Sequence, residues 1–302
     1  MDHPCQIFFL APVTRDSGLT SMALGLVQAL LRDHVAVGFI KPIMQPADRG
    51  TADLSTYFAR TLLHLDVPDP IPFAAAEARV RADGLDALLE DMVAAVDVAG
   101  AGCDAVVVEG LIPDAGLQIA AHLNAAMVRA FAATLVPVLS SDRHDPAVLA
   151  AMVDLALRQF AEAEEPPPLA GVLINRLQVG PAALTAPIVG GAVVPVLGDV
   201  PWEPRLAALR LTDVREALDL GIEQEGGLAR SRVQEFVIAG SGVEGLIDRL
   251  RPGALVVVAG ERSDIVLASG LAYAQGMPLA GLLLTCGSQL TPQVAALLRA
   301  PT

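Results

Sequence analysis

Along the first two thirds of the chain, short apolar runs alternate with longer segments in which apolar residues recur every third or fourth position. The short runs are rich in Val, Ile and Leu, as strands are, and the longer spacing is typical of amphipathic helices. This alternation predicts an α/β fold, a mostly parallel sheet with helices on both faces. Strands are predicted over 6–12, 36–43, 104–109, 134–140, 169–174 and 193–197, and helices over 18–32, 53–65, 84–98, 116–132 and 146–163.

The pattern changes after Trp202. Residues 203–232 are charged and predict a connecting helical segment, whereas 178–192 lack periodicity and predict a loop. A second, smaller α/β pattern then begins and is still incomplete where the sequence stops, so we expect a truncated domain or one that pairs with something else. Its strands are predicted over 233–238, 254–259 and 279–284, and its helices over 243–250, 264–275 and 292–299. The domains are therefore predicted as 1–202, 203–232 and 233–302.

Composition narrows the classes of protein that fit this pattern. The chain has 302 residues, 53% of them hydrophobic, and a formal net charge of −14 without a basic cluster, which argues against a nucleic-acid partner. No uncharged apolar stretch is long enough to span a bilayer, so no membrane partner is expected. The excess apolar residues suit a buried sheet and an interface in a homo-oligomer. The three cysteines lack metal-ligand spacing and are expected to be buried free thiols of a cytoplasmic protein.

Between the first predicted strand and helix, residues 14–21 read Thr-Arg-Asp-Ser-Gly-Leu-Thr-Ser. A strand–loop–helix of this kind places backbone N–H groups at a helix N-terminus, where they can hold an anion. The phosphate-loop motif G-x-x-x-x-G-K-[ST] has four defining residues, and two of them, Gly18 and Thr20, are present here. Val13 replaces the first glycine, and Leu19 replaces the lysine. Because that lysine neutralises phosphate charge, the sequence indicates a scaffold for nucleotide binding without the machinery for phosphoryl transfer.

Three polar side chains stand at the carboxyl ends of predicted strands, where the ligand crevice of an open α/β sheet lies. Lys41 either points into that crevice or is a solvated surface lysine. Glu109 either holds Mg²⁺ or caps the next segment. Asn175 either recognises a base or belongs to a turn.

In this order, these segments resemble the dethiobiotin synthetase group of phosphate-loop proteins. The resemblance implies that Lys41 contacts a substrate carbamate, that Asn175 contacts adenine, and that Thr20, Asp53 and Glu109 bind a metal. Leu19 departs from that group's loop. The candidate anion- and nucleotide-binding residues are Thr14, Arg15, Ser17, Gly18, Leu19, Thr20, Ser21, Lys41 and Asn175. The candidate cofactors are a nucleotide and Mg²⁺.

A closer resemblance covers essentially the whole chain. The N-terminal region of long-form bacterial phosphate acetyltransferases is similar, with leucine as part of the loop pattern and a DRTGG-type domain in the second half. The matching segments include 39–46, 106–113, 123–124, 195–202, 250–255, 262–264 and 281–285. In that family a separate C-terminal domain exchanges acetyl between coenzyme A and phosphate. The resemblance implies that this domain is the partner of the chain, which alone is not catalytic.

Three functions remain open on these grounds. The leading hypothesis is a regulatory and oligomerisation region that binds a small-metabolite effector. The second is an ATP-dependent enzyme that activates a carboxylate or forms an amide, with Arg15 supplying the charge that Leu19 lacks. The third is a structural interaction module that binds nothing in the crevice.

Overall fold

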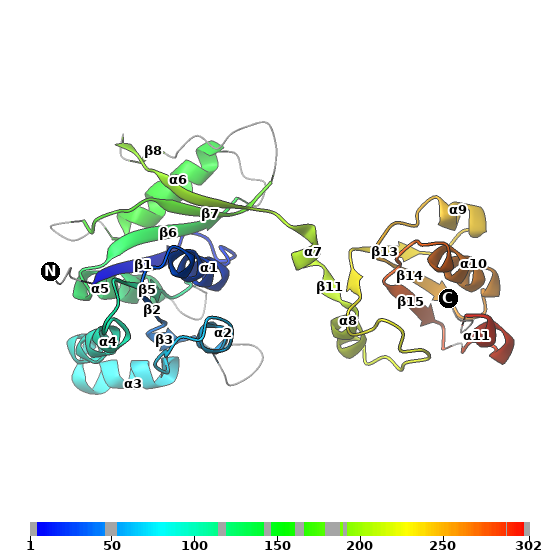
Figure 1. The fold of residues 1–302 in the computed structure, drawn as a ribbon, viewed down its shortest axis with the longest axis horizontal. Coiled ribbons are helices and arrows are strands. Elements are labelled where there is room, and N and C mark those ends of the chain that lie inside the picture. The colour runs from blue at the N-terminus through cyan, green and yellow to red at the C-terminus, as the bar shows by residue number, and fades with distance from the viewer. Residues whose placement is uncertain are drawn as a thin grey trace. The chain divides into compact units, whose positions relative to one another are not determined.

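The computed structural model describes residues 5–45, 53–113, 119–141, 146–160, 166–178, 188–189, 192–287 and 289–298. It divides into two compact units, residues 1–202 and 203–302, and each is described by itself (Figure 1). Among the helices of the described residues, none is both long and apolar enough to cross a membrane.

A six-stranded sheet of order β10-β7-β6-β1-β5-β2 forms the first unit, and every neighbouring pair in it is parallel. The predicted parallel α/β fold is therefore confirmed. All carboxyl ends lie at one edge of the sheet, with β6 and β1 in the middle and β5 between β1 and the edge strand β2. The strands are β1 (Gln6–Pro12), β2 (Val37–Ile40), β5 (Ala105–Glu109), β6 (Thr134–Ser140), β7 (Val172–Leu177) and β10 (Val196–Pro201).

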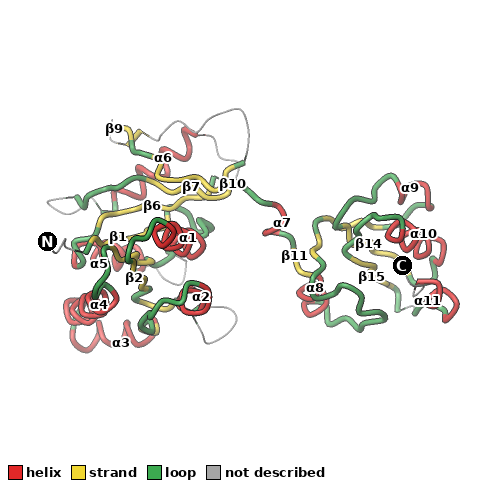
Figure 2. The backbone as a smooth tube through the Cα atoms, viewed as in Figure 1, coloured by secondary structure: helices red, strands yellow, loops and turns green. Residues whose placement is uncertain are grey.

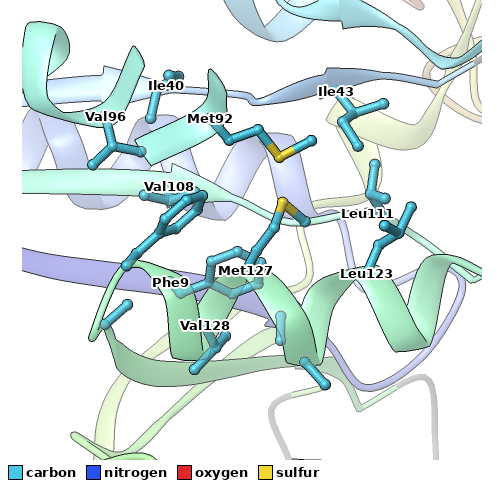
Figure 3. Close-up of a cluster of buried hydrophobic side chains, with 14 of the residues drawn as sticks. Phe9, Ile40, Ile43, Met92, Val96, Val108, Leu111, Leu123, Met127 and Val128 are labelled. Atoms are coloured by element: carbon cyan, nitrogen blue, oxygen red, sulfur yellow. The ribbon is translucent and has the colours of Figure 1, made fainter. Parts of the chain in front are cut away.

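Helices cover both faces of this sheet because successive strand residues point to opposite sides. Figure 2 draws the helices around the sheet in red. In β1, Leu10 packs in one cluster with residues of α1 and α2, and Phe9 packs in another with residues of α3, α4 and α5 (Figure 3). In the second cluster, Met92 of α4 and Met127 of α5 lie near Phe9 and Val108 (Figure 3). The helices are α1 (Leu19–Arg32), α2 (Leu54–Leu62), α3 (Phe73–Asp83), α4 (Leu85–Ala99), α5 (Ala120–Ala130) and α6 (Pro146–Arg158).

The structure corrects several predicted elements. Helix α3 was not predicted because only Ala76 in it is buried, so no apolar stripe marks it. The strand predicted over 36–43 ends at Ile40, before Pro42, and Ile43–Met44 (β3) pairs with Ile71–Pro72 (β4) instead. Two residue pairs in the predicted loop 178–192 are short antiparallel strands, Ile188–Val189 (β8) and Ala192–Val193 (β9); 179–187 and 190–191 lie outside the described residues. The strand predicted over 193–197 lies later, at β10.

The second unit holds a three-stranded parallel sheet of order β13-β14-β15. One face packs against α9, α10 and α11, while Val214 of α8 packs with Leu255 and Leu283. Cys286 is exposed and Cys5 and Cys103 are only partly buried, so the expectation that the three cysteines are buried is wrong. The elements are α7 (Pro204–Ala207), β11 (Leu209–Arg210), α8 (Leu211–Ala217), β12 (Arg232–Val233), β13 (Glu235–Ile238), α9 (Val243–Ile247), β14 (Ala254–Ala259), α10 (Ser263–Ala274), β15 (Gly281–Thr285) and α11 (Pro292–Leu298).

Gly38 lets β2 approach the end of α4 closely. A Cβ at this position would lie 2.1 Å from the carbonyl oxygen of Ala99, a backbone atom that cannot rotate away. We predict that Gly38→Ala lowers the free energy of unfolding by about 1–3 kcal/mol, the usual cost of overpacking. Gly25, exposed within α1 with nothing near its Cβ position, is the matched control. Gly25→Ala should raise stability by about 0.5–1 kcal/mol, because alanine loses less entropy in a helix. Urea unfolding measures both, and equal effects of the two variants would contradict the close-approach argument.

Candidate functional site

The predicted site residues gather at the carboxyl edge of the six-stranded sheet. Residues 13–18 connect β1 to α1, Lys41 directly follows β2, Glu109 ends β5, and Asn175 lies in β7. They form two linked groups, one that holds the loop and one that clusters charge beside the start of α1.

Neighbouring strands hold the loop in place. The Asn175 side-chain amide donates a hydrogen bond from Nδ2 to the carbonyl oxygen of Ser17 at 2.9 Å, and its Oδ1 accepts one from the Arg176 backbone N–H. The Ser140 backbone N–H donates to Oγ1 of Thr14 at 3.4 Å. Asn175 therefore fastens the loop, a contact that the sequence did not indicate, and its predicted contact with adenine stays a prediction.

Gly18 satisfies two demands of this loop. Its φ of 71° lies in the left-handed region that favours glycine, and a Cβ here would come within 2.3 Å of Nδ2 of Asn175. The sequence motif therefore marks a position where both conformation and space require glycine.

The Leu19 side chain does not face the crevice. It is 1% exposed and packs beneath the loop with Leu10, Met22 and Phe39. Leu19 could therefore contact an anion only through its backbone. Arg15 and Ser21 are exposed, Arg15 on the loop and Ser21 on the first turn of α1.

Beside the loop lies a buried charged cluster. Lys41 Nζ is 2.9 Å from Oδ1 of Asp53 and 3.3 Å from Oε1 of Glu109. The Thr20 hydroxyl donates to the same Glu109 oxygen at 2.8 Å. Thr20, Lys41, Asp53 and Glu109, which lie far apart in the sequence, therefore meet as predicted, while their roles toward a ligand stay predictions.

Ser55 stands at the centre of this cluster and was missed from the sequence. Its hydroxyl donates to Oε1 of Glu109 at 3.0 Å and accepts from Lys41 Nζ at 3.3 Å, and it lies 3.1 Å from the Thr20 hydroxyl. The available signal was its place in the first turn of α2, two residues after Asp53, the residue that caps this helix. A serine on that turn is expected to lie close to the capping residue, and therefore close to the groups that Asp53 contacts.

Two buried or partly buried amides fix the segment after β5, and both were also missed as site residues. Asn124 Nδ2 donates to the carbonyl oxygen of Leu111 and Oδ1 accepts from its N–H, both at 2.8 Å. Gln45 makes the same pair of contacts with Ile112, again at 2.8 Å. The signal for Asn124 was a lone amide in an otherwise apolar stretch of α5.

Burial and charge act against each other in the cluster. Burial raises the pKa of Glu109, and the Lys41 ammonium with the Thr20 and Ser55 hydroxyls offsets only part of that rise. Burial would lower the pKa of Lys41, but Glu109 and Asp53 outweigh it, so the pKa of Lys41 is raised. Lys41 is therefore protonated at neutral pH and supplies the positive charge that the two carboxylates require.

Four buried side-chain oxygens at or beside this edge have no hydrogen-bond partner within the described residues. They are Ser17 Oγ, Thr56 Oγ1, Glu109 Oε2 and Ser140 Oγ. Such groups are costly in a protein interior unless something binds them. A cavity of about 310 Å³ is lined by the α2 cap Asp53 and by Thr56 and Arg60 of α2, among others. Polar groups able to meet a small polar ligand are thus concentrated at this edge.

The oxygen ligands that Mg²⁺ prefers are present, but the arrangement does not suit the ion. Thr20, Asp53 and Glu109 offer a hydroxyl and two carboxylates. The Lys41 ammonium, however, already contacts both carboxylates. No group of three or more His, Cys, Asp or Glu side chains suited to a metal occurs in the part of the chain that the structure describes. The metal site stays a prediction that the observed contacts do not favour.

Solved structures show a limited likeness to this chain. A ParA family ATPase from Chlorobium tepidum is 15% identical, with 66% of this chain and 84% of that chain covered at a TM-score of 0.42. Cobyrinic acid a,c-diamide synthase from Mycobacterium smegmatis, with bound ADP and magnesium, is 14% identical, with coverages of 58% and 75% and a TM-score of 0.39.

Sequence relatives match over nearly the whole chain. A phosphate acetyltransferase of Pseudomonas aeruginosa is 34% identical over 311 residues, which cover 97% of this chain and 44% of the relative. One from Deinococcus radiodurans is 36% identical over 289 residues, which cover 93% and 41%. The chain thus spans less than half the length of these relatives.

Two family models match the chain, and the boundary between them lies close in sequence to the boundary between the two units. The AAA domain model matches residues 6–210, and the DRTGG domain model matches residues 213–301. The chain belongs to the AAA domain family and, with the DRTGG domain that follows, corresponds to the N-terminal region of phosphate acetyltransferases.

Proposed function

We propose that this chain is the regulatory and oligomerisation region of a phosphate acetyltransferase, and that its loop binds an anionic effector without reacting with it. In the whole protein, a C-terminal domain would convert acetyl-coenzyme A and phosphate into acetyl phosphate and coenzyme A. The observation that carries the proposal is a loop before α1 that hydrogen bonds of Thr14 and Asn175 hold to the neighbouring strands, while the Leu19 side chain is buried in the core.

Binding is supported by what surrounds the start of α1. The first-turn N–H groups of a helix carry partial positive charge and attract anions. The buried Ser17 and Ser140 hydroxyls, which have no partner within the described residues, could donate to the same ligand. An effector that binds one state of an oligomer more tightly than another shifts the balance between them. This gives a non-catalytic site a regulatory use.

Catalysis is supported less well. An ATP-dependent reaction needs a cation on the transferred phosphate, and the Leu19 side chain lies in the core. Lys41, which the resemblance assigns to a substrate carbamate, is held by Asp53 and Glu109 instead. Arg15 is exposed on the loop and remains the candidate cation for this second function.

Assembly into a homo-oligomer, binding of a small-metabolite effector and a cytoplasmic location are part of the leading proposal, the regulatory region.

Substitution of Ser17 tests whether its hydroxyl contributes to ligand binding or to folding. If it serves an anion, Ser17→Ala should leave stability unchanged or raise it by about 1–3 kcal/mol, since it removes an unsatisfied buried group. The same change should weaken binding of ATP or pyrophosphate by about tenfold, the value of one hydrogen bond to a charged group. Calorimetric titration and urea unfolding measure the two effects. Ser269→Ala is the matched control, because Ser269 is equally buried but donates to the Ile265 carbonyl in the other unit. No anion binding by the unsubstituted chain would favour the structural interaction module.

Leu19→Lys tests whether a lysine can be restored to the loop. Because Leu19 is packed among apolar side chains, the lysine should lower the free energy of unfolding by about 3 kcal/mol or more without strengthening nucleotide binding. Leu19→Met, which conserves volume, should cost less than about 1.5 kcal/mol. Thermal unfolding and nucleotide titration of the three proteins distinguish these results. A tighter nucleotide complex with Leu19→Lys would mean that position 19 faces the crevice.

The location of the acetyl transfer is directly testable. These 302 residues alone should not form acetyl phosphate from acetyl-coenzyme A and phosphate, because the resemblance assigns that chemistry to a C-terminal domain and the match covers only 44% of the Pseudomonas aeruginosa relative. The assay follows free thiol release against a buffer control. Turnover that persists through repurification would place the reaction in this region and reject the proposal.

A further inference from the structure

Lys41 is the one lysine in the sequence; the remaining basic residues among its 20 Lys and Arg are arginines. It is 9% exposed and follows β2 directly, at the carboxyl edge of the sheet. A chain that otherwise uses arginine as its strong cation thus has lysine at one enclosed place between two carboxylates. An ammonium is a compact point charge, whereas a guanidinium is a planar fork that needs more room.

All three residues that would bind a metal contact protein groups, and of their side-chain oxygens only Oε2 of Glu109 has no partner within the described residues. Oδ1 of Asp53 contacts Lys41, and Oδ2 accepts the Thr56 backbone N–H at 2.8 Å as the cap of α2. Oε1 of Glu109 accepts hydrogen bonds from Thr20 and Ser55 and lies 3.3 Å from Lys41 Nζ. The Thr20 hydroxyl therefore uses its one hydrogen to donate a hydrogen bond to the Glu109 carboxylate. A divalent ion here would have to displace several of these contacts and would stand beside a second positive charge.

We propose that this crevice works without a metal, and that the Lys41 ammonium is its resident cation, held by Asp53 and Glu109 where a divalent ion would otherwise bind. The lysine then joins the ends of β2 and β5 to Asp53, the cap of α2, through ion pairs. An anion at the loop would bind as the free anion, not as its magnesium complex. This inference rests on the cluster alone and holds whether or not an effector binds, so its failure and that of the proposed function are distinguishable.

The single lysine makes the test direct. In the chain labelled with ¹⁵N-lysine, one side-chain ammonium signal should appear, since the ion pairs protect it from exchange with water. Addition of Mg²⁺ should leave that signal unmoved, and electron paramagnetic resonance should find no Mn²⁺ bound at the cluster. A shift of the Lys41 signal with Mg²⁺, or one bound Mn²⁺ that Glu109→Gln abolishes, would overturn the proposal.

Removing the ammonium should create the metal site. Lys41→Ala should unfold at a lower temperature in EDTA, recover part of the loss with Mn²⁺ or Mg²⁺, and bind one Mn²⁺ per chain. Lys41→Arg keeps the charge and should bind none, even though the larger guanidinium should lower stability. Adding Glu109→Gln to Lys41→Ala should abolish the gained binding. Equal Mn²⁺ affinity in the unsubstituted chain and in Lys41→Ala would show that the lysine does not exclude the metal. If Lys41→Ala does not fold, the measurements on the unsubstituted chain decide alone.

Discussion

The architecture of the crevice depends on compensating one buried carboxylate. Glu109 is 2% exposed at the end of β5, an interior strand of the sheet, where an isolated negative charge would be strongly unfavourable. Its partners come from three other places: Thr20 from α1, Ser55 from α2 and Lys41 from the end of β2. Each partner brings its own element to the carboxyl edge, so one electrostatic requirement fixes how the loop helix, the capped helix and the edge strand meet.

Much of the fold followed from the sequence because buried parallel strands carry a strong apolar signal. β5 and β14 are continuously apolar segments, and both were predicted with nearly correct bounds. Helix α3 could not be found this way, since only Ala76 in it is buried and its apolar positions form no stripe. β10 was misplaced because it lies at the edge of the sheet and carries Gly198 and Asp199, which are not typical of a strand.

The site was predictable where a motif fixes chemistry and not where tertiary contacts do. Strand-end placement was enough to bring Lys41 and Glu109 to the loop. The role of Ser55 depends on how the cap of α2 is turned toward β5, and no local pattern contains that information. For Leu19, the motif alone led to the wrong expectation about the side chain. Its position in the motif suggested the crevice, but the packing of α1 against the sheet directs its side chain inward.

The fastening of residues 13–18 by Thr14 and Asn175 bears on how the region could pass on a signal. A loop already held by its neighbours is preorganised, so a ligand loses little affinity to ordering it. The same rigidity leaves little room for a closing movement of the loop. Under the proposed function, an effector would therefore act by changing the relative stability of the assembled states, with the loop as a fixed receptor and not as a moving part.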